Sequence, residues 1–481
     1  MKPIEIPTFQ PRMRVLSREQ VLAIHTAALE ILESLGIWME HDGVRAMLCD
    51  AGCRPVEGNW VRVPAHLVAD ALASAPRQIL LHDQQGNRAM PLVDDNPFYG
   101  TGSDATFTID LDSGERRRTV LEDVTRFARL VDGLENMSFA MSMSNPEDVP
   151  VENIYVHVFA DMVKNTNKPI VFIADSGRDI AHIHEIASLV AGGEEALRTK
   201  PFLLNYSEPI SPLRFPANVM EKLVFCAEKG IPICFPPGAN AGGGAPVTLA
   251  GALAQGLAEN LAGLVIHQLA GKGSPFLFGP NVSALDMKST VVCYGCPEWS
   301  LTQAALADMR DELYGLPIWS FAGASDSKVM DAQAGAESMF SIITAMLSRC
   351  NLIHDGGYLE YGNTSSLEMV VMNNELVSMS RAFVQGIAVD EDNLAFDAIG
   401  RVAKEPGSMF LMDDHTFEHF MQAQFLPRLL DRSRYDAWEE AGGMDIYRRC
   451  NDEAKRVLAE HQVEPKPDSV LQEIDTILHQ R

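Results

Sequence analysis

The sequence predicts an α/β protein built on a TIM (β/α)8 barrel, with an N-terminal α+β elaboration and a C-terminal helical tail. From residue 138 onward, short apolar runs bounded by Gly, Pro, Asn or Asp alternate with stretches of helical periodicity. Seven such units fit into about 250 residues, which is typical of a TIM barrel. The first run is not followed by GxGxxG, which disfavours a doubly wound dinucleotide fold.

The alternation predicts parallel strands joined by right-handed crossovers. The predicted strands are residues 138–142, 170–174, 202–206, 231–235, 275–278, 317–321 and 352–354. The predicted helices are residues 152–167, 178–192, 215–229, 248–271, 298–314, 331–348 and 366–382. An eighth strand is expected within 383–389 (FVQGIAV).

The regions before and after this repeat do not show the regular alternation of strand and helix. Residues 17–35 predict a helix that begins behind Ser17 as N-cap, and residues 78–111 contain short extended runs separated by turns, as in hairpins. We therefore divide the chain into an N-terminal elaboration (1–135), a barrel core (136–389) and a helical extension (390–481). The long amphipathic extension is expected to pack on the barrel or on a second subunit, which predicts a homo-oligomer.

Composition excludes several classes of partner. The 481 residues carry a net charge of -26, which argues against nucleic acid and anionic membranes. Eight scattered cysteines and the absence of an apolar leader favour a reduced cytoplasmic setting. Cys293 and Cys296 form a lone CxxC, so no metal site is expected. The apolar segment 247–269 contains several polar residues and predicts a buried helix rather than a membrane span.

Carboxylates, one histidine and aromatic residues gather at the ends of the predicted strands, where TIM barrels place their chemistry. Such a set suits a cationic or zwitterionic small molecule, because aromatic faces and carboxylates attract an ammonium group. Each residue also has a plain structural explanation. Glu208 could cap a loop, Asp326 could cap the following helix, Glu368 could brace helix 366–382, and His354 could be a core histidine. The tyrosines could be ordinary packing residues.

Several long motifs resemble one known family. They are FYGTGSDATFTIDLDSGERR (98–117), SEPISPL (207–213), GASDSKVMDAQAGAESM (323–339), HDGGYLEYGNTSSLEMVVMNNEL (354–376) and VLAEHQVEPKPDSVLQEIDTIL (457–478). In these motifs the chain resembles the trimethylamine methyltransferase family almost from end to end. The resemblance implies a TIM barrel that transfers a methyl group from a methylated amine to the cob(I)alamin of a corrinoid protein docked at the barrel mouth.

One departure from the family narrows the expected substrate. Trimethylamine enzymes of the family use pyrrolysine, whose position is expected near 323–334, and this sequence has none. Members without pyrrolysine look like demethylases of quaternary amines such as glycine betaine, proline betaine and carnitine. We therefore expect a quaternary-amine methyltransferase, with glycine betaine as the first candidate because it is the smallest. Another methylated amine, and a binding or sensing protein that has lost transfer, remain open alternatives.

The proposed roles follow motif position and chemistry. Glu208, Asp326 and Glu368 are expected to shape the electrostatic field as catalytic residues. His354 is expected to bind the substrate carboxylate. The small-residue loop 236–244, with Gly242, Gly243 and Gly244, is expected to admit the corrinoid, which this chain does not itself bind as a cofactor. The expected ammonium cage consists of Tyr206, Trp319, Tyr358 and Tyr361.

Overall fold

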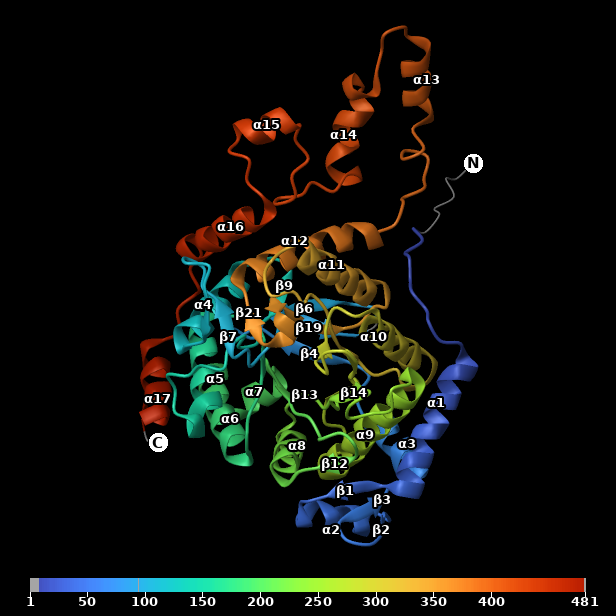
Figure 1. Ribbon diagram of the computed structural model, residues 1–481, viewed down its shortest axis with the longest axis vertical. Coiled ribbons are helices and arrows are strands. Elements are labelled where there is room, and N and C mark those ends of the chain that lie inside the picture. The colour runs from blue at the N-terminus through green and yellow to red at the C-terminus, as the bar shows by residue number, and fades with distance from the viewer. Residues whose placement is uncertain (1–7, 94, 480–481) are drawn as a thin grey trace.

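The centre of the molecule is a closed barrel of parallel strands, seen in the computed structural model, which describes residues 8–93 and 95–479 (Figure 1). In barrel order the strands are β6 (Phe98–Thr101), β9 (Met137–Phe139), β10 (Ile170–Phe172), β11 (Leu203–Tyr206), β13 (Ile233–Cys234), β15 (Phe276–Leu277), β18 (Trp319–Phe321) and β19 (Leu352–Gly356). Two parallel four-stranded ladders are joined by bridges at Ala140–Ile170 and Phe278–Ile318. The predicted TIM barrel is therefore present.

Seven of the predicted strands are confirmed, and the eighth was predicted in the wrong place. Helix α12 (Leu367–Val384) occupies the start of 383–389, and the remaining residues form no strand. The eighth strand is β6, which pairs in parallel with β19 on one side and β9 on the other. Because β6 is short and lies among hairpin-like turns, its sequence resembles a hairpin strand. The barrel thus begins within the residues that the sequence assigned to the N-terminal elaboration.

A helix follows each barrel strand and packs on the outside of the barrel. These helices are α4 (Leu121–Gly133), α5 (Ile154–Asn165), α6 (Gly177–Ala191) with the short α7 (Glu194–Thr199), α8 (Ala217–Lys229), α9 (Leu249–Ala270), α10 (Pro297–Met309), α11 (Ala332–Leu347) and α12. All seven helices predicted between residues 152 and 382 are confirmed. Helix α9 is long and apolar enough to cross a membrane, but 83% of its most apolar window is buried inside the fold, as in a core helix.

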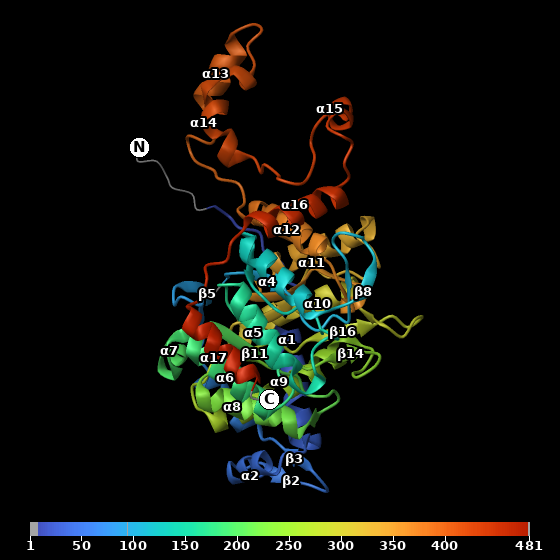
Figure 2. The same cartoon turned by 90° about the vertical axis from the view of Figure 1, so that its left-hand side faces the viewer.

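An N-terminal hairpin closes the bottom of the barrel. Strands β4 (Ile79–His82) and β5 (Arg88–Leu92) are antiparallel, and Ile79, Leu81, Met90 and Leu92 share one buried cluster with inward-facing barrel residues such as Phe139 and Leu352. Figure 2 shows β5 on the opposite side of the barrel from β14 (Ala239–Ala241) and β16 (Val282–Leu285). The far end, where the carboxyl ends of the strands lie, is therefore the open mouth.

The rest of the N-terminal region is mixed α and β. It contains α1 (Arg18–Glu30), the π-helical turn Ile31–Leu35, β1 (Ile37–Met39), α2 (Asp42–Asp50), β2 (Arg54–Pro55), β3 (Trp60–Arg62) and α3 (Ala65–Ser74). Ser17 and Gln20 form the expected capping box at the start of α1. Strand β12 (Arg214–Phe215), from the loop after β11, completes a four-stranded sheet with β1, β3 and β2. This sheet ties the elaboration to the barrel.

The C-terminal region divides into two parts. Helices α16 (Ile446–Glu460) and α17 (Asp468–His479) pack on the barrel through buried residues such as Cys450, Ala454 and Ile474. Residues 385–445, here called the arm, project away from the barrel at the top of Figure 1. The arm contains α13 (Phe396–Lys404), the turn Phe410–Met412, α14 (Asp414–Ala423) and α15 (Tyr435–Glu440).

The hairpin that closes the barrel should contribute directly to stability. We expect Leu81→Ala to lower the free energy of unfolding by about 2–5 kcal/mol, because Leu81 is fully buried and its loss leaves a cavity. Chemical denaturation followed by circular dichroism measures the change. Leu35→Ala, at an exposed leucine, is the matched control and should change stability by less than about 0.5 kcal/mol. Equal effects of the two substitutions would contradict the assignment of this hairpin to the core.

Candidate functional site

A cavity of ≈ 440 Å³ lies at the mouth of the barrel. Its polar and aromatic lining comes from loops after different strands, which meet there because all eight strands are parallel. Four tyrosines, four carboxylates and one lysine are among the lining residues: Tyr155, Tyr206, Tyr294, Tyr358, Asp104, Asp175, Glu208, Asp355 and Lys222. His354 also lines the cavity. The site is therefore acidic and aromatic.

Strands β11, β18 and β19 place three rings at the floor of this cavity. The ring of His354 stacks on Trp319 with centroids 4.2 Å apart, and Tyr206 lies 5.2 Å from Trp319. Tyr206 and His354 line the cavity, whereas Trp319 is buried beneath them and supports both rings. The Nδ1 atom of His354 lies 2.6 Å from an oxygen of Asp355, which fixes the orientation of the imidazole.

A small sheet at the mouth holds Asp104 and Tyr358. Strands β7 (Phe107–Ile109) and β8 (Arg116–Arg118) pair with β20 (Tyr358–Leu359) and β21 (Thr364–Ser365), and the Tyr358 hydroxyl donates to the Ser103 carbonyl. Asp104 and Asp355 both have positive φ angles, of 61° and 77°. Left-handed backbone at non-glycine residues costs energy and tends to occur at functional sites.

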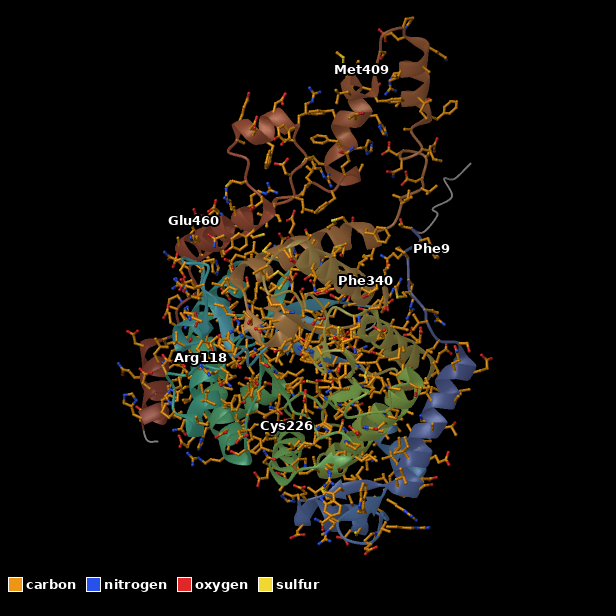
Figure 3. The ribbon with its side chains drawn as sticks, viewed as in Figure 1. Phe9, Arg118, Cys226, Phe340, Met409 and Glu460 are labelled. Atoms are coloured by element: carbon orange, nitrogen blue, oxygen red, sulfur yellow. The ribbon has the colours of Figure 1, made fainter. Side chains whose placement is uncertain are left out.

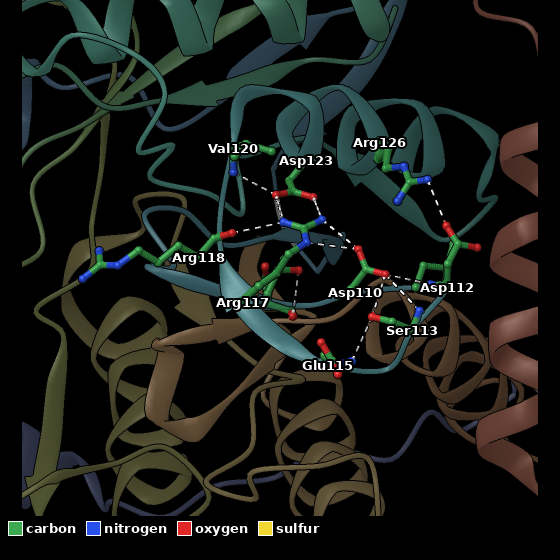
Figure 4. A network of polar contacts seen from close by, with 12 residues as sticks. Asp110, Asp112, Ser113, Glu115, Arg117, Arg118, Val120, Asp123 and Arg126 are labelled. Carbon is green, nitrogen blue, oxygen red and sulfur yellow. Dashed lines mark hydrogen bonds and ion pairs between the residues drawn. The ribbon is translucent and has the colours of Figure 1, made fainter.

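An ion-pair network anchors this sheet to the barrel. The guanidinium of Arg117 binds the Asp123 carboxylate through two nitrogens, at 2.7 and 2.8 Å, and Nε donates to Asp110 at 3.0 Å (Figure 4). Asp123 belongs to α4, the helix that follows β6, and Asp110 to the turn after β7. The network therefore fixes the position of the chain segment just after Asp104.

A second loop brings Tyr294 over the cavity. The Asp326 carboxylate accepts hydrogen bonds from the backbone N–H of Tyr294 (2.8 Å) and Gly295 (2.9 Å), and from the thiol of Cys293 (3.0 Å). The Tyr294 ring packs on Trp299, with centroids 4.2 Å apart. Asp326 is thus a positioning residue, which holds the loop whose tyrosine lines the cavity.

Two carboxylates of the cavity, Glu208 and Asp104, have raised pKa values. Burial, together with the negative charges of Asp355 and Asp104, raises the pKa of Glu208 to about 7, while Lys222 opposes the rise. Burial likewise raises the pKa of Asp104 to about 7. Burial lowers the pKa of Lys222, whose Nζ donates to the Ala174 carbonyl at 2.7 Å. The charge of the empty cavity therefore changes near neutral pH.

The structure brings together only part of the predicted site. Glu208, Tyr206, His354 and Tyr358 line the cavity. Glu368 does not, because its carboxylate is buried and accepts from Ser366 and from Asn451 of α16. Tyr361 is not among the lining residues and lies on a turn between β20 and β21. Asp326 and Trp319 act beneath or beside the cavity rather than facing it.

Sequence reasoning missed Asp104, Tyr155, Lys222 and Tyr294. Asp104 was overlooked because β6 was taken for a hairpin strand, although the sequence FYGTGSD has the same apolar run with a polar end as the other barrel strands. Tyr155 and Lys222 come from helices α5 and α8, and their orientation depends on how these helices pack. No local pattern in the sequence identifies such residues.

The loops at the mouth expose small and apolar residues. Gly242 and Gly243 are exposed on the turn after β14, and Gly244 is half-buried beside Ser211. Five exposed large apolar residues lie on loops after five different strands: Val151, Ile210, Val247, Met287 and Val329. These five residues are here called the apolar rim. Among the described residues, no cluster of three or more metal ligands occurs.

Fold and site together define a TIM-barrel protein with an acidic, aromatic cavity at its mouth. The comparisons with known proteins are more specific. A model of the family described as trimethylamine methyltransferase (MTTB) matches residues 3–481. The chain therefore belongs to this family, whose members are methyltransferases.

The most informative relatives span nearly the whole chain. A glycine betaine methyltransferase from Desulfitobacterium hafniense is 32% identical over 467 residues, which cover 96% of each protein. A trimethylamine methyltransferase from Methanosarcina barkeri is 30% identical over 479 residues, or 97% of this chain and 94% of its own. The monomethylamine methyltransferase of Methanosarcina barkeri has the same fold, with a TM-score of 0.52, 10% identity, and coverage of 93% of this chain and 88% of its own.

The role of Asp326 is open to a direct test. We expect Asp326→Asn to lower the free energy of unfolding by about 1–3 kcal/mol, because the amide replaces one accepting oxygen with a donor that faces N–H groups. Hydrogen exchange at Tyr294 and Gly295 should become faster. Asp50→Asn, at an exposed position, is the matched control. Unchanged exchange at Tyr294 would show that Asp326 does not hold this loop.

Proposed function

We propose that this protein transfers a methyl group from a quaternary amine, with glycine betaine as the first candidate, to the cob(I)alamin of a separate corrinoid protein. The observation that carries this proposal is the mouth cavity, in which four tyrosines and four carboxylates surround a space of ≈ 440 Å³. Aromatic faces and carboxylates bind quaternary ammonium ions well. The 32% identity to a glycine betaine methyltransferase supports the same substrate class.

Methyl transfer from a quaternary nitrogen needs no proton donor. When its N–CH3 bond breaks, the electron pair stays on nitrogen, and the product is a neutral tertiary amine that needs no proton. The corrinoid, supplied by the partner, provides the nucleophile that accepts the methyl group. The tasks of this chain are to hold one N-methyl group toward the mouth and to exclude water.

The raised pKa values of Glu208 and Asp104 suit a site that binds a cation and then removes its charge. Methyl transfer removes the positive charge of the substrate, so a strongly negative cavity would stabilise the bound substrate more than the transition state. Since the pKa values of Glu208 and Asp104 are raised to about 7, the negative charge of the cavity is moderated near neutral pH. The carboxylates then attract the cation without holding it too strongly.

The carboxylate of a betaine would need a cationic or hydrogen-donating partner. His354 was predicted for this role from the sequence, and it lines the cavity with Nδ1 already engaged by Asp355. Lys222 is the single lysine or arginine among the lining residues, and its ammonium group donates to the Ala174 carbonyl. We propose that Lys222 and His354 share the substrate carboxylate.

The apolar rim supports docking of the corrinoid protein at the mouth. The exposed apolar residues Val151, Ile210, Val247, Met287 and Val329 lie on loops after five barrel strands, and the turn at Gly242–Gly244 has no bulky side chains of its own. A partner seated there would cover the cavity and bring its corrinoid to the substrate. We place this encounter in the cytoplasm, where the eight cysteines, all free thiols in the structure, would stay reduced.

Methylation of reduced cobalamin tests the proposal. The assay follows the loss of Co(I) absorbance with glycine betaine, proline betaine, carnitine, choline or trimethylamine as methyl donor. We expect turnover with one betaine and none with trimethylamine. Saturable binding without turnover of any donor would instead indicate a quaternary-amine sensor. Turnover of choline alone would show that no substrate carboxylate is required and would contradict the role given to Lys222 and His354.

The pH dependence of cation binding tests the cavity electrostatics. As the pH falls from 8 to 6, Glu208 and Asp104 take up protons, because their pKa values are raised to about 7. We therefore expect the affinity for tetramethylammonium, measured by calorimetry, to fall about tenfold over this range. Glu208→Gln should weaken binding at pH 8 and reduce the pH dependence. Glu57→Gln, at an exposed glutamate, should change neither.

The same groups affect stability with a defined sign. A carboxyl whose pKa is raised in the folded state favours folding while it is protonated, so its contribution is complete below about pH 4 and is lost as the pH rises through about 7. Glu208→Gln should therefore flatten the decline in stability between these pH values. A steeper decline in this variant would contradict the raised pKa of Glu208.

A further inference from the structure

The arm, residues 385–445, is almost entirely exposed to solvent. Ala398 is the single buried residue between 385 and 445, all of which the structure describes. The backbone N–H groups of Arg428 and Leu429 donate to Glu375 and tie this part of the arm to α12. Helices α13, α14 and α15 have 9, 10 and 6 residues. Isolated helices shorter than about 12–15 residues are marginal in water, so these helices need a surface to pack on.

The arm also carries an unusual amount of exposed apolar surface. Phe396, Leu411, Met412 and Phe417 are each at least 80% exposed. Four further large residues are at least 60% exposed: Ile387, Leu394, Met421 and Tyr435. So many exposed large apolar residues within one segment of a globular protein indicate an interaction site.

The barrel of the same chain offers a complementary surface. An apolar groove of ≈ 490 Å³ lies between the N-terminal segment, α10 and α11, and Met13, Val15, Leu301 and Phe340 are among its lining residues. Leu301 and Phe340 are about half exposed, and exposed Met379 and Phe383 on the neighbouring α12 extend the apolar surface toward the base of the arm. Figure 3 shows Phe340 on the barrel and Met409 near the outer end of the arm.

We propose that the arm of one copy of this chain packs into the α10–α11 groove of a second copy. One chain supplies both apolar surfaces, so a two-fold dimer covers two arms and two grooves at once. Burying eight large side chains, at roughly 150 Å² each, would remove on the order of 1,000 Å² of accessible surface per arm. Two arms together would bury as much surface as a specific protein–protein interface does. The homo-oligomer predicted from the sequence thus gains a defined contact.

The orientation of the arm favours a second copy over the corrinoid protein as the occupant. In Figure 2 the arm extends from the top of the molecule, whereas the mouth loops at β14 and β16 project to one side. The arm therefore leaves the cavity entrance free. This contact between two copies does not depend on methyl transfer. Sedimentation and cross-linking measure the mass of the assembly and the contact itself, not activity.

Sedimentation velocity with paired variants tests the proposal. The wild-type chain of 52.8 kDa should sediment at twice this mass or a higher multiple at about 10 μM. The arm variant Leu411→Asp/Phe417→Asp and the groove variant Leu301→Asp/Phe340→Asp should both sediment as monomers, and mixing the two should restore a dimer through the one intact contact. Val56→Asp, at a similarly exposed residue on the N-terminal sheet, is the control and should assemble like the wild type.

A wild-type monomer would overturn the proposal, as would an arm or groove variant that still assembles like the control. Cross-linking gives a second reading that does not depend on disruptive substitutions. A photoreactive benzoylphenylalanine in place of Leu411, in mixed light and nitrogen-15-labelled copies, should join the arm of one copy to α10 or α11 of the other. Cross-links within one copy, or to other elements, would show that the arm packs elsewhere.

Discussion

Closure of the barrel by β6 is the constraint on which the site depends. Because β6 lies between β19 and β9, the loop that begins after Thr101 crosses the mouth beside the end of β19. Asp104 and Asp355 thereby line the same cavity, and the Tyr358 hydroxyl reaches the carbonyl of Ser103. Without β6 in this position, Asp104 would not reach the cavity. The Arg117 network serves this closure, since it fixes the chain that follows Asp104.

The carboxylates in the cavity repel each other electrostatically, and other groups must offset this repulsion for the fold to remain stable. Lys222 offsets part of the repulsion, and protonation of Glu208 and Asp104 near neutral pH offsets more. Binding a quaternary cation would remove the remaining repulsion, which couples occupancy of the site to its charge. This coupling distinguishes the cavity from a group of acidic residues whose role is purely structural. Other carboxylates in the chain, such as Asp326 and Glu368, are satisfied by hydrogen bonds within the protein.

The sequence predicted the barrel well because each strand and helix has its own periodicity and turn residues. It failed at β6, where four residues between turns carry no sign of whether they pair with neighbours or with a distant strand such as β19. Glu208, Tyr206, His354 and Tyr358 were found from the sequence because they follow apolar strands. Tyr155 and Lys222 were not, since they lie on helices, and only the packing of these helices turns the two side chains toward the cavity. Asp326 was found, but its hydrogen bonds to the Tyr294 loop come from a distant segment that no local pattern reveals.

The central claim is that the mouth cavity holds a quaternary ammonium among its tyrosines and carboxylates. A crystal structure with bound glycine betaine tests this claim most directly. The account predicts that the trimethylammonium group lies among Tyr155, Tyr206, Tyr294 and Tyr358, with the substrate carboxylate directed toward Lys222 and His354. Density for the ligand at another site, or a reversed orientation with the substrate carboxylate among the four tyrosines, would contradict this placement.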